Sequence, residues 1–357
     1  MRNAPCNLDR LIGENQSFAI YRLPGSPVVR FVPQRANTSP SLLYRMEDLN
    51  EESGFVIAPF EISALCPIVL IRPGREMILP APEGKDLFPH IGKRPPSAGA
   101  DAAYESRFNA FIAPIREKRF RKLVLSRSLD IDREEGFSPE EAFFRACTNY
   151  TRSYVYLFHT PATGTWLGCT PEILLSGGND RWKAVALAGT QALCGEALPE
   201  TWDDKNLIEQ MLVAHYIREQ LASCGIRPEE NGPYTVRAGY LAHLRTDFYF
   251  SLPDIRRIGL LLKLLHPTPA VLGLPKEEAR RFIPAHEGYD RRYYSGFAGW
   301  LDPKGETDLY VNLRCMQIHP QAFTLYAGGG LLLSSRLEDE WRETEDKLLT
   351  MRLLTRQ

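Results

Sequence analysis

Apolar residues recur along the chain in short runs, and these runs predict strands. In the first ninety residues the runs are separated by Pro, Gly and Asn, which end strands and form turns. Their sequences are FAIYRL at 18–23, FVIAPF at 55–60 and CPIVLIRP at 66–73. The stretch GKRPPSAGADA at 92–102 follows them and, being rich in Pro, Gly and Ala, predicts a linker.

Beyond residue 100 the pattern separates helices from strands. Helices are predicted at 102–120, at 203–225 and from about Leu337 to the C-terminus. In the second of these, Asp203 or Asp204 can cap the start and Gly225 can end the last turn. Strands are predicted at 121–131, 153–160, 165–177, 181–189, 309–318 and 322–334. Because neighbouring strands are joined by short turns, with helices between groups of strands, the pattern favours an α+β fold with largely antiparallel sheets.

The composition of the chain excludes some classes of binding partner. The 357 residues include 43 Lys and Arg against 44 Asp and Glu, a balance that excludes a broad basic surface for nucleic acid or membrane. The seven cysteines form no CxxC pair, which favours reduced thiols and a cytoplasmic protein. The N-terminus lacks the apolar core of a signal peptide, and Lys263 and Pro267 interrupt the most apolar stretch, 258–274. We therefore expect neither membrane nor nucleic-acid partners.

The C-terminal helix carries the first candidate chemistry. Glu340, Glu343 and Lys347 are spaced i, i+3 and i+7, so they share one helical face. A solvated face with internal ion pairs is the alternative. Gly328, Gly329 and Gly330 precede the helix, where successive N–H groups can form an anion-binding nest or, alternatively, a flexible turn. An acidic face beside such a nest suits Mg²⁺ next to a carboxylate ligand.

Three further residues are candidates for metal binding or proton transfer. Glu209 lies among apolar helix residues, where a buried carboxylate needs a cation or a proton; the alternative is an exposed edge. Lys122 shares a strand face with Val124, and a lysine in a partly dry site can act as a general base, although such a lysine can also be a surface residue. Glu172 follows Pro171 at the start of an apolar run, where burial can raise its pKa enough for acid catalysis, unless its role is structural.

Ten segments in a fixed order resemble the chorismate-utilising enzymes. They are KLVLSR, GCTPEILL, ALAGT, the DxKNxxE helix, HL, LHPTPAV, DRRYYSGFAGW, VNLR, YAGGG and EWRETEDK. The resemblance covers residues 105 to 352, whereas the first hundred residues match only loosely. It implies two parts of one α/β body, a divergent region 1–100 and a catalytic region 101–357. It also implies large, mostly antiparallel sheets flanked by helices around a central active-site cleft.

The resemblance also implies a role for each matching residue. Lys122 matches the base that activates water to attack C2 of chorismate, and Glu172 matches the acid that protonates the departing C4 hydroxyl. The implied Mg²⁺ ligands are Glu209 and Glu343, with Glu340 beside them holding metal-bound water. The implied substrate-binding residues are Ala188, Gly189, Thr190, His243, Ala270, Tyr294, Arg314, Gly328, Gly329 and Lys347.

Two positions narrow the implied reaction. Members of this family that add ammonia carry Gln in place of Lys122, and members that form a lysine adduct carry Lys in place of Ala188. The chain thus resembles the water-adding members, which are isochorismate synthases and salicylate synthases. The expectation is a Mg²⁺-dependent, monomeric isochorismate synthase for menaquinone, without a glutamine amidotransferase subunit. The alternatives are a siderophore-pathway enzyme, a salicylate synthase that also eliminates pyruvate, and a non-catalytic chorismate-binding relative.

Overall fold

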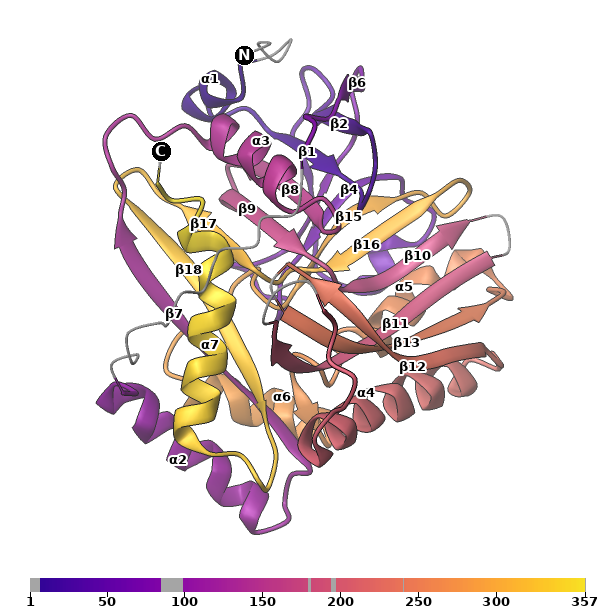
Figure 1. The fold of residues 1–357 in the computed structure, drawn as a ribbon. Helices are drawn as coiled ribbons and strands as arrows, with labels where there is room; N and C mark the ends of the chain where they lie inside the picture. The colour runs from indigo at the N-terminus through magenta and orange to yellow at the C-terminus, as the bar shows by residue number, and fades with distance from the viewer. Residues whose placement is uncertain (1–6, 85–98, 179–180, 194–196, 240, 357) are drawn as a thin grey trace.

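Two antiparallel sheets form the body of the protein in the computed structural model, which describes residues 7–84, 99–178, 181–193, 197–239 and 241–356 (Figure 1). Within these residues each sheet has nine strands. The first runs in the order β14 (Gly273–Leu274), β7 (Lys122–Asp132), β18 (Ala322–Leu331), β17 (Cys315–Ile318), β9 (Gly164–Thr170), β8 (Tyr154–Thr160), β1 (Phe18–Arg22), β2 (Val28–Pro33), β6 (Met77–Pro80).

The second sheet has the same size and the same antiparallel pairing. Its order is β12 (Glu229–Ala238), β13 (Leu241–Phe250), β11 (Arg181–Ala192), β10 (Ile173–Gly178), β16 (Thr307–Val311), β15 (Phe297–Leu301), β4 (Gly54–Ala58), β5 (Ile68–Ile71), β3 (Ser41–Leu43). Strands from the first hundred residues therefore complete both sheets. The boundary predicted at residue 100 stays a prediction, and most of the predicted linker, 92–98, lies outside the described residues.

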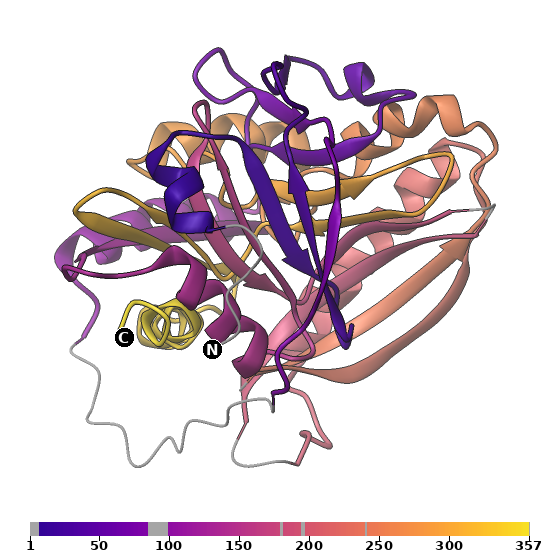
Figure 2. The same ribbon diagram turned by 90° about the horizontal axis from the view of Figure 1, so that it is seen from above.

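Helices cover the outer faces of the sheets (Figures 1 and 2). Those packed on the first sheet and on one another are α1 (Leu8–Gly13), α2 (Ala102–Arg116), α3 (Pro139–Asn149), α6 (Lys276–His286) and α7 (Leu337–Arg352). On the second sheet α4 (Asp204–Ser223) packs against β11 and β13, and α5 (Ile258–Leu265) packs beside α4. The predicted α+β class with antiparallel sheets is confirmed.

Between the sheets lies a core rich in aromatic residues. Tyr154 of the first sheet stacks on Tyr310 of the second, with ring centroids 4.2 Å apart. Trp166 stacks on Tyr326, whose ring also stacks on Tyr294. Large flat side chains fill the space between facing sheets and bring extensive apolar area out of water. This packing fixes the spacing of the two sheets next to the site described below.

Two predicted strands are corrected by the structure, because each is in fact two strands in different sheets. The run at 165–177 leaves the first sheet after Thr170 and enters the second at Ile173. The run at 309–318 leaves the second sheet after Val311 and enters the first at Cys315. Pro171 lacks the N–H that a continuous ladder needs, and Arg314 has a left-handed backbone with φ +47°.

The predicted glycine nest is wrong. Gly328, Gly329 and Gly330 lie inside β18, paired with Ser126, Leu125 and Val124 of β7. These glycines therefore form an antiparallel ladder along the edge facing β7 instead of an anion-binding turn.

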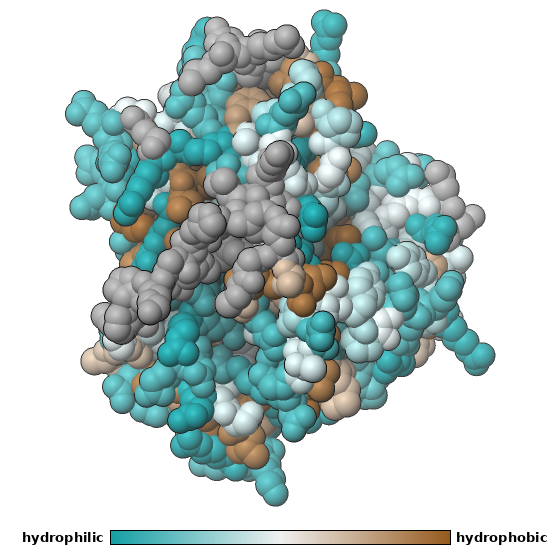
Figure 3. All heavy atoms as spheres, in the orientation of Figure 1, coloured by the Kyte–Doolittle hydropathy of each residue, from teal (hydrophilic) through white to brown (hydrophobic). Residues whose placement is uncertain are grey.

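On the surface, hydrophilic side chains cover most of the face seen in Figure 3, with smaller apolar areas between them. Among the described residues, no helix is both long and apolar enough to cross a membrane.

Candidate active site

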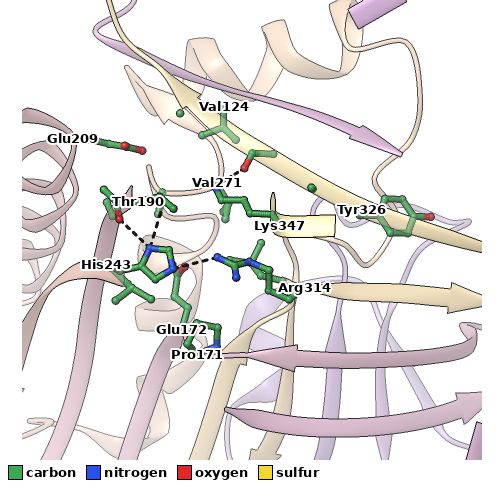
Figure 4. A pocket seen from close by; sticks show the side chains of 18 of the residues that line it. Val124, Pro171, Glu172, Thr190, Glu209, His243, Val271, Arg314, Tyr326 and Lys347 are labelled. Carbon is green, nitrogen blue, oxygen red and sulfur yellow. Dashed lines mark hydrogen bonds between the residues drawn. The ribbon is translucent and has the colours of Figure 1, made fainter. Parts of the chain in front are cut away.

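A pocket opens where the chain crosses between the two sheets (Figure 4). Its lining comes from both sheets, from α4 and α7, and from the loops before β14 and β15. Eleven of the residues predicted for the site line it: Glu172, Ala188, Gly189, Thr190, Glu209, His243, Ala270, Tyr294, Arg314, Gly328 and Lys347. The remaining four, Lys122, Gly329, Glu340 and Glu343, lie directly behind this lining, as the following contacts show.

Lys122 begins β7 and is fully buried, with 0% of its side chain exposed. Its Nζ donates a hydrogen bond of 2.8 Å to Oε1 of Glu209, which lines the pocket from α4. A buried carboxylate and a buried ammonium are costly to desolvate separately, so each stabilises the other here. The predicted base and the predicted metal ligand thus form one ion pair at the pocket wall.

Two more lysines pair with the carboxylates of α7. Lys347 donates to Glu343 over 2.6 Å and to the carbonyl oxygen of Gly328 over 2.7 Å. Lys205, at the start of α4, donates to Glu340 over 2.5 Å. The sequence analysis missed Lys205, although it stands inside the DxKNxxE segment that located Glu209. Each predicted acidic residue of the metal site therefore has its own lysine.

Burial and neighbouring charges shift the pKa values of these carboxyl groups in different directions. Burial and the charge of Glu343 raise the pKa of Glu340 to about 7. Burial by itself raises the pKa of Glu343, but the charges of Lys347 and Lys205 outweigh it and lower that pKa to about 2. Glu343 is therefore the more strongly ionised member of the pair, and Glu340 holds a proton more readily.

Glu172 is the buried acid of the site. It stands between β9 and β10 at one of the sheet crossings, with 4% of the residue exposed. Burial raises its pKa to about 7, even though the charges of Lys122, Lys347 and Arg314 act to lower it. A carboxyl group with such a pKa can carry and release a proton near neutrality.

His243 of β13 and Arg314 at the other sheet crossing also line the pocket (Figure 4). His243 Nδ1 lies 2.9 Å from the carbonyl oxygen of Gly189, and Arg314 Nη2 lies 3.2 Å from His243 Nε2. Burial, with the charge of Arg314, lowers the pKa of His243 to about 3. The imidazole is therefore neutral, and Arg314 presents a positive charge to an anionic ligand.

The glycines of β18 are needed for space, which explains their presence in a strand. A Cβ on Gly330 would lie 2.3 Å from Glu209 Oε1 and 2.7 Å from Lys122 Cε. On Gly329 it would lie 2.9 Å from Glu340 Oε2. The bare backbone thus lets the carboxylates of α4 and α7 approach the same stretch of strand.

The donors near these glycines fit a hard cation. Among the described residues no three His, Cys, Asp or Glu side chains are gathered closely enough to form a metal site as they stand. However, Oε2 of Glu340 is buried without a hydrogen-bond partner in the described part of the chain, and Glu343 lies near the same glycine. Carboxylate oxygens are the ligands that Mg²⁺ prefers, so Glu209, Glu340 and Glu343 are chemically suited to hold it.

Comparison with known proteins identifies the family. A model described as chorismate binding enzyme matches residues 89–355, more than half of the chain. The chain belongs to the chorismate binding enzyme family. Isochorismate synthase EntC of Escherichia coli is 32% identical over 243 residues, which span 64% of this chain and 61% of EntC. Isochorismate synthase MenF of the same organism is 33% identical over 252 residues, which span 67% of this chain and 57% of MenF.

Solved structures show that the fold is shared across this family. The menaquinone-specific isochorismate synthase MenF of E. coli superimposes with a TM-score of 0.78 and 21% identity, covering 100% of this chain and 92% of that one. Anthranilate synthase component I of Streptococcus pneumoniae superimposes with a TM-score of 0.67 and 19% identity, covering 96% and 91%. The expected chorismate-binding fold is therefore confirmed.

Proposed function

We propose that the protein is an isochorismate synthase, an isomerase that interconverts chorismate and isochorismate. One observation carries this proposal: a lysine and a carboxyl group of raised pKa lie at the same pocket. Glu172 lines the pocket, and Lys122 lies directly behind the lining, hydrogen-bonded to Glu209. Its support from relatives is the similarity to EntC and MenF, both named isochorismate synthases.

In the proposed forward reaction, water adds at C2 and the C4 hydroxyl leaves as water. The step requires Lys122 as the neutral amine, which accepts a proton from the attacking water and becomes the ammonium as the C2–O bond forms. Glu172 donates its proton to the C4 hydroxyl as the C4–O bond breaks, so atoms and charge balance. Lys122 stands on β7 of the first sheet and Glu172 at a crossing between the two sheets, which lets them act at different atoms of one bound ring.

Substrate carboxylates are assigned to the positive groups around the pocket. Arg314 and Lys347 would bind and orient them, with the backbone of Gly328 and Gly329 alongside. Mg²⁺, held by Glu209 and Glu343 with Glu340 beside them, would supply further positive charge for a substrate carboxylate when bound. Ala188 lies in the pocket with no amine to offer, which fits water as the nucleophile.

Incubation of the purified protein with chorismate and Mg²⁺ tests this proposal. We expect isochorismate to accumulate to an equilibrium mixture without pyruvate. Direct release of salicylate and pyruvate would instead establish a salicylate synthase. Binding of chorismate without turnover would establish a non-catalytic relative.

Menaquinone biosynthesis is the proposed destination of the product, and a siderophore pathway is the alternative. Relatives of both kinds are similar to the chain, including a menaquinone-specific and a vibriobactin-specific isochorismate synthase. Restoration of menaquinone in a strain lacking its own isochorismate synthase for that pathway would support the first. Because water is the nucleophile, we also propose that the protein acts without an amidotransferase subunit. From the cysteine pattern and the family resemblance we propose that it is a cytoplasmic monomer.

A further inference from the structure

The partners of the two ring nitrogens of His243 fix the position of the ring proton. Nδ1 lies 2.9 Å from the carbonyl oxygen of Gly189, which can only accept a hydrogen bond, and farther, at 3.4 Å, from the Thr190 hydroxyl, which can accept as well as donate. Nε2 lies 3.2 Å from Nη2 of Arg314, which can only donate one. The proton of the ring must therefore be on Nδ1, and Nε2 must be an acceptor for Arg314. Both nitrogens are thus occupied by protein groups.

The carbonyl of Gly189 is aimed at His243 by a bulge in β11. Pairing with β13 shifts between Ala188 and Thr190, so Gly189 is the extra residue, and its φ of +75° is one that glycine tolerates. Without this bulge a regular strand would direct the Gly189 carbonyl along the ladder toward the neighbouring strand's backbone.

Asn206 holds the bulge in place. Its Oδ1 accepts a 2.8 Å hydrogen bond from the backbone N–H of Thr190, next to Gly189. Its Nδ2 donates to both carboxylate oxygens of Asp203, over 2.9 and 3.0 Å, which fixes the orientation of the amide. Asp203 also caps α4. The first turn of α4 is thus linked to Arg314 through Asn206, Gly189 and His243.

We infer that His243 and Asn206 are positioning residues that aim the guanidinium of Arg314 at a carboxylate of the substrate, and that His243 does so as a neutral, Nδ1-protonated acceptor. This inference rests on the proposed function, because it takes the ligand to be the anionic substrate. It deepens that proposal by excluding His243 from proton transfer: its Nε2 carries no proton, and its Nδ1 proton is held by Gly189. The lowered pKa of the buried imidazole agrees with this role.

Two substitutions at His243 separate positioning from proton transfer. In His243→Gln the longer amide can place its carbonyl oxygen where Nε2 now accepts from Arg314. In His243→Asn the shorter amide keeps a donor for Gly189 but does not reach Arg314 in place of Nε2. We expect H243N to raise KM for chorismate ~10-fold or more, with kcat within about threefold of wild type, and H243Q to restore most of the KM. Equal loss of kcat in both variants, with KM unchanged, would overturn the inference.

Asn206→Ala tests the link through the bulge. We expect KM to rise roughly fivefold with little change in kcat, because Thr190 and Gly189 lose their anchor but no group in contact with substrate is removed. Met211→Ala is the matched control, since Met211 lies on the same helix with 60% of the residue exposed. A KM in N206A equal to that of M211A would contradict the positioning role of Asn206. Thermal unfolding of each variant confirms that it is folded.

Nitrogen-15 NMR of histidine-labelled protein tests the tautomer without any substrate. The His243 signals are those that disappear in H243Q. We expect wild type to show Nδ1 protonated and Nε2 unprotonated at neutral pH, and N206A to shift both signals. An Nε2-protonated or doubly protonated ring would overturn the inference. If the protein does not turn over chorismate but shows the expected tautomer, the proposed function fails while the hydrogen-bonded arrangement stands.

Discussion

At the scale of single residues, the site is built from ion pairs that are almost closed to water. Lys122, Lys205 and Lys347 each hold one of the glutamates on α4 and α7. A single unpaired charge at these depths would cost several kcal/mol, whereas alternating charges offset one another. A chain with 43 basic and 44 acidic residues can therefore contain a site of high charge density. Overall charge excluded a broad basic surface but gave no sign of this arrangement.

Replacement of Lys122 by alanine tests the base at the pocket wall. We expect kcat to fall ~10²–10⁴-fold, because the attacking water loses the group that takes its proton. The variant also leaves Glu209 without its partner, so we expect unfolding to become easier by ~3 kcal/mol or more. Steady-state kinetics well below the unfolding temperature separates the two effects.

Lys263→Ala is the control for the Lys122 variant. Lys263 pairs with Glu47 over the same 2.8 Å, but 59% of its side chain is exposed, and exposed pairs contribute little. Its kcat should equal that of wild type. If Lys122→Ala behaves like this control, Lys122 is not the base.

The protonation of Glu172 gives a prediction about pH. Its pKa is raised from 4.5 to about 7, so the acid form persists through mild acidity and is lost as pH rises past 7. We expect the rate of the forward reaction to fall about tenfold per pH unit above this point, as one required proton disappears. A pH profile of kcat/KM for wild type, which reports the groups of the free enzyme, measures this limb.

Glu172→Gln complements the pH profile, because glutamine keeps the shape of the glutamic acid side chain but has no acidic proton to donate. We expect kcat to fall ~10²–10⁴-fold. The folded protein holds this proton between pH 4.5 and 7 while the unfolded chain releases it, so the wild type should lose stability as pH rises through that window. The glutamine variant should lack this part of the pH dependence; a variant as active as wild type would contradict an acid role.

At the scale of elements, the places where sequence patterns misled are the places where the site forms. The runs at 165–177 and 309–318 are apolar enough to predict one strand each, but each crosses between sheets, at Glu172 and at Arg314. Periodicity reports burial, and both halves of each run are buried, so it cannot show a change of sheet. The helix predicted at 203–225 is α4, Asp204–Ser223, and of the two predicted caps Asp203 is the one that caps it.

The orientation of that same helix could not be predicted. In its first turns Asn206, Glu209 and Gln210 are buried, whereas Leu207 and Met211 are exposed. An amphipathic pattern assigns apolar residues to the buried face, yet here the buried face is polar because it borders a charged pocket. The pattern alone left Glu209 as either a buried carboxylate or an exposed edge residue; the ordered motifs of the family resemblance favoured the first, and Lys205 was missed even so.

Gly330→Ala tests the strand that gives the carboxylates room. The new methyl group would stand 2.3 Å from Glu209 Oε1 and 2.7 Å from Lys122 Cε, so the ion pair must move. We expect a destabilisation of ~1–3 kcal/mol and a loss of kcat of at least ~10-fold. Gly13→Ala is the control, since a Cβ there meets no atom within 4 Å. Wild-type kinetics in Gly330→Ala would mean that the Lys122–Glu209 geometry is not required.

At the scale of the whole molecule, the pocket exists only where the two sheets meet. Its residues come from positions as far apart in the sequence as Val124 and Lys347. Local patterns could therefore supply the strands and the α+β class, but not which strands are neighbours. The order of the ten motifs indicated the arrangement of the strands, because it resembles that of chorismate-utilising enzymes. Solved structures of such enzymes superimpose on this one along nearly its whole length.

Because a ligand in this pocket contacts both sheets, its binding should stabilise the molecule as a whole, and the effect should depend on Mg²⁺. Chorismate at about 100 times its Kd contributes ~2.7 kcal/mol to the folded state, which should raise Tm by several degrees. In EDTA the positive charge that the cation would supply is lost, so we expect this rise to shrink severalfold and turnover to stop until Mg²⁺ is restored. Thermal unfolding with and without each ligand measures the rise in Tm.

Glu343→Gln should lose the Mg²⁺ dependence of this rise, whereas Glu219→Gln, on an exposed helix face, should keep it. An equal rise in Tm with and without Mg²⁺ would show that these carboxylates do not act through a cation.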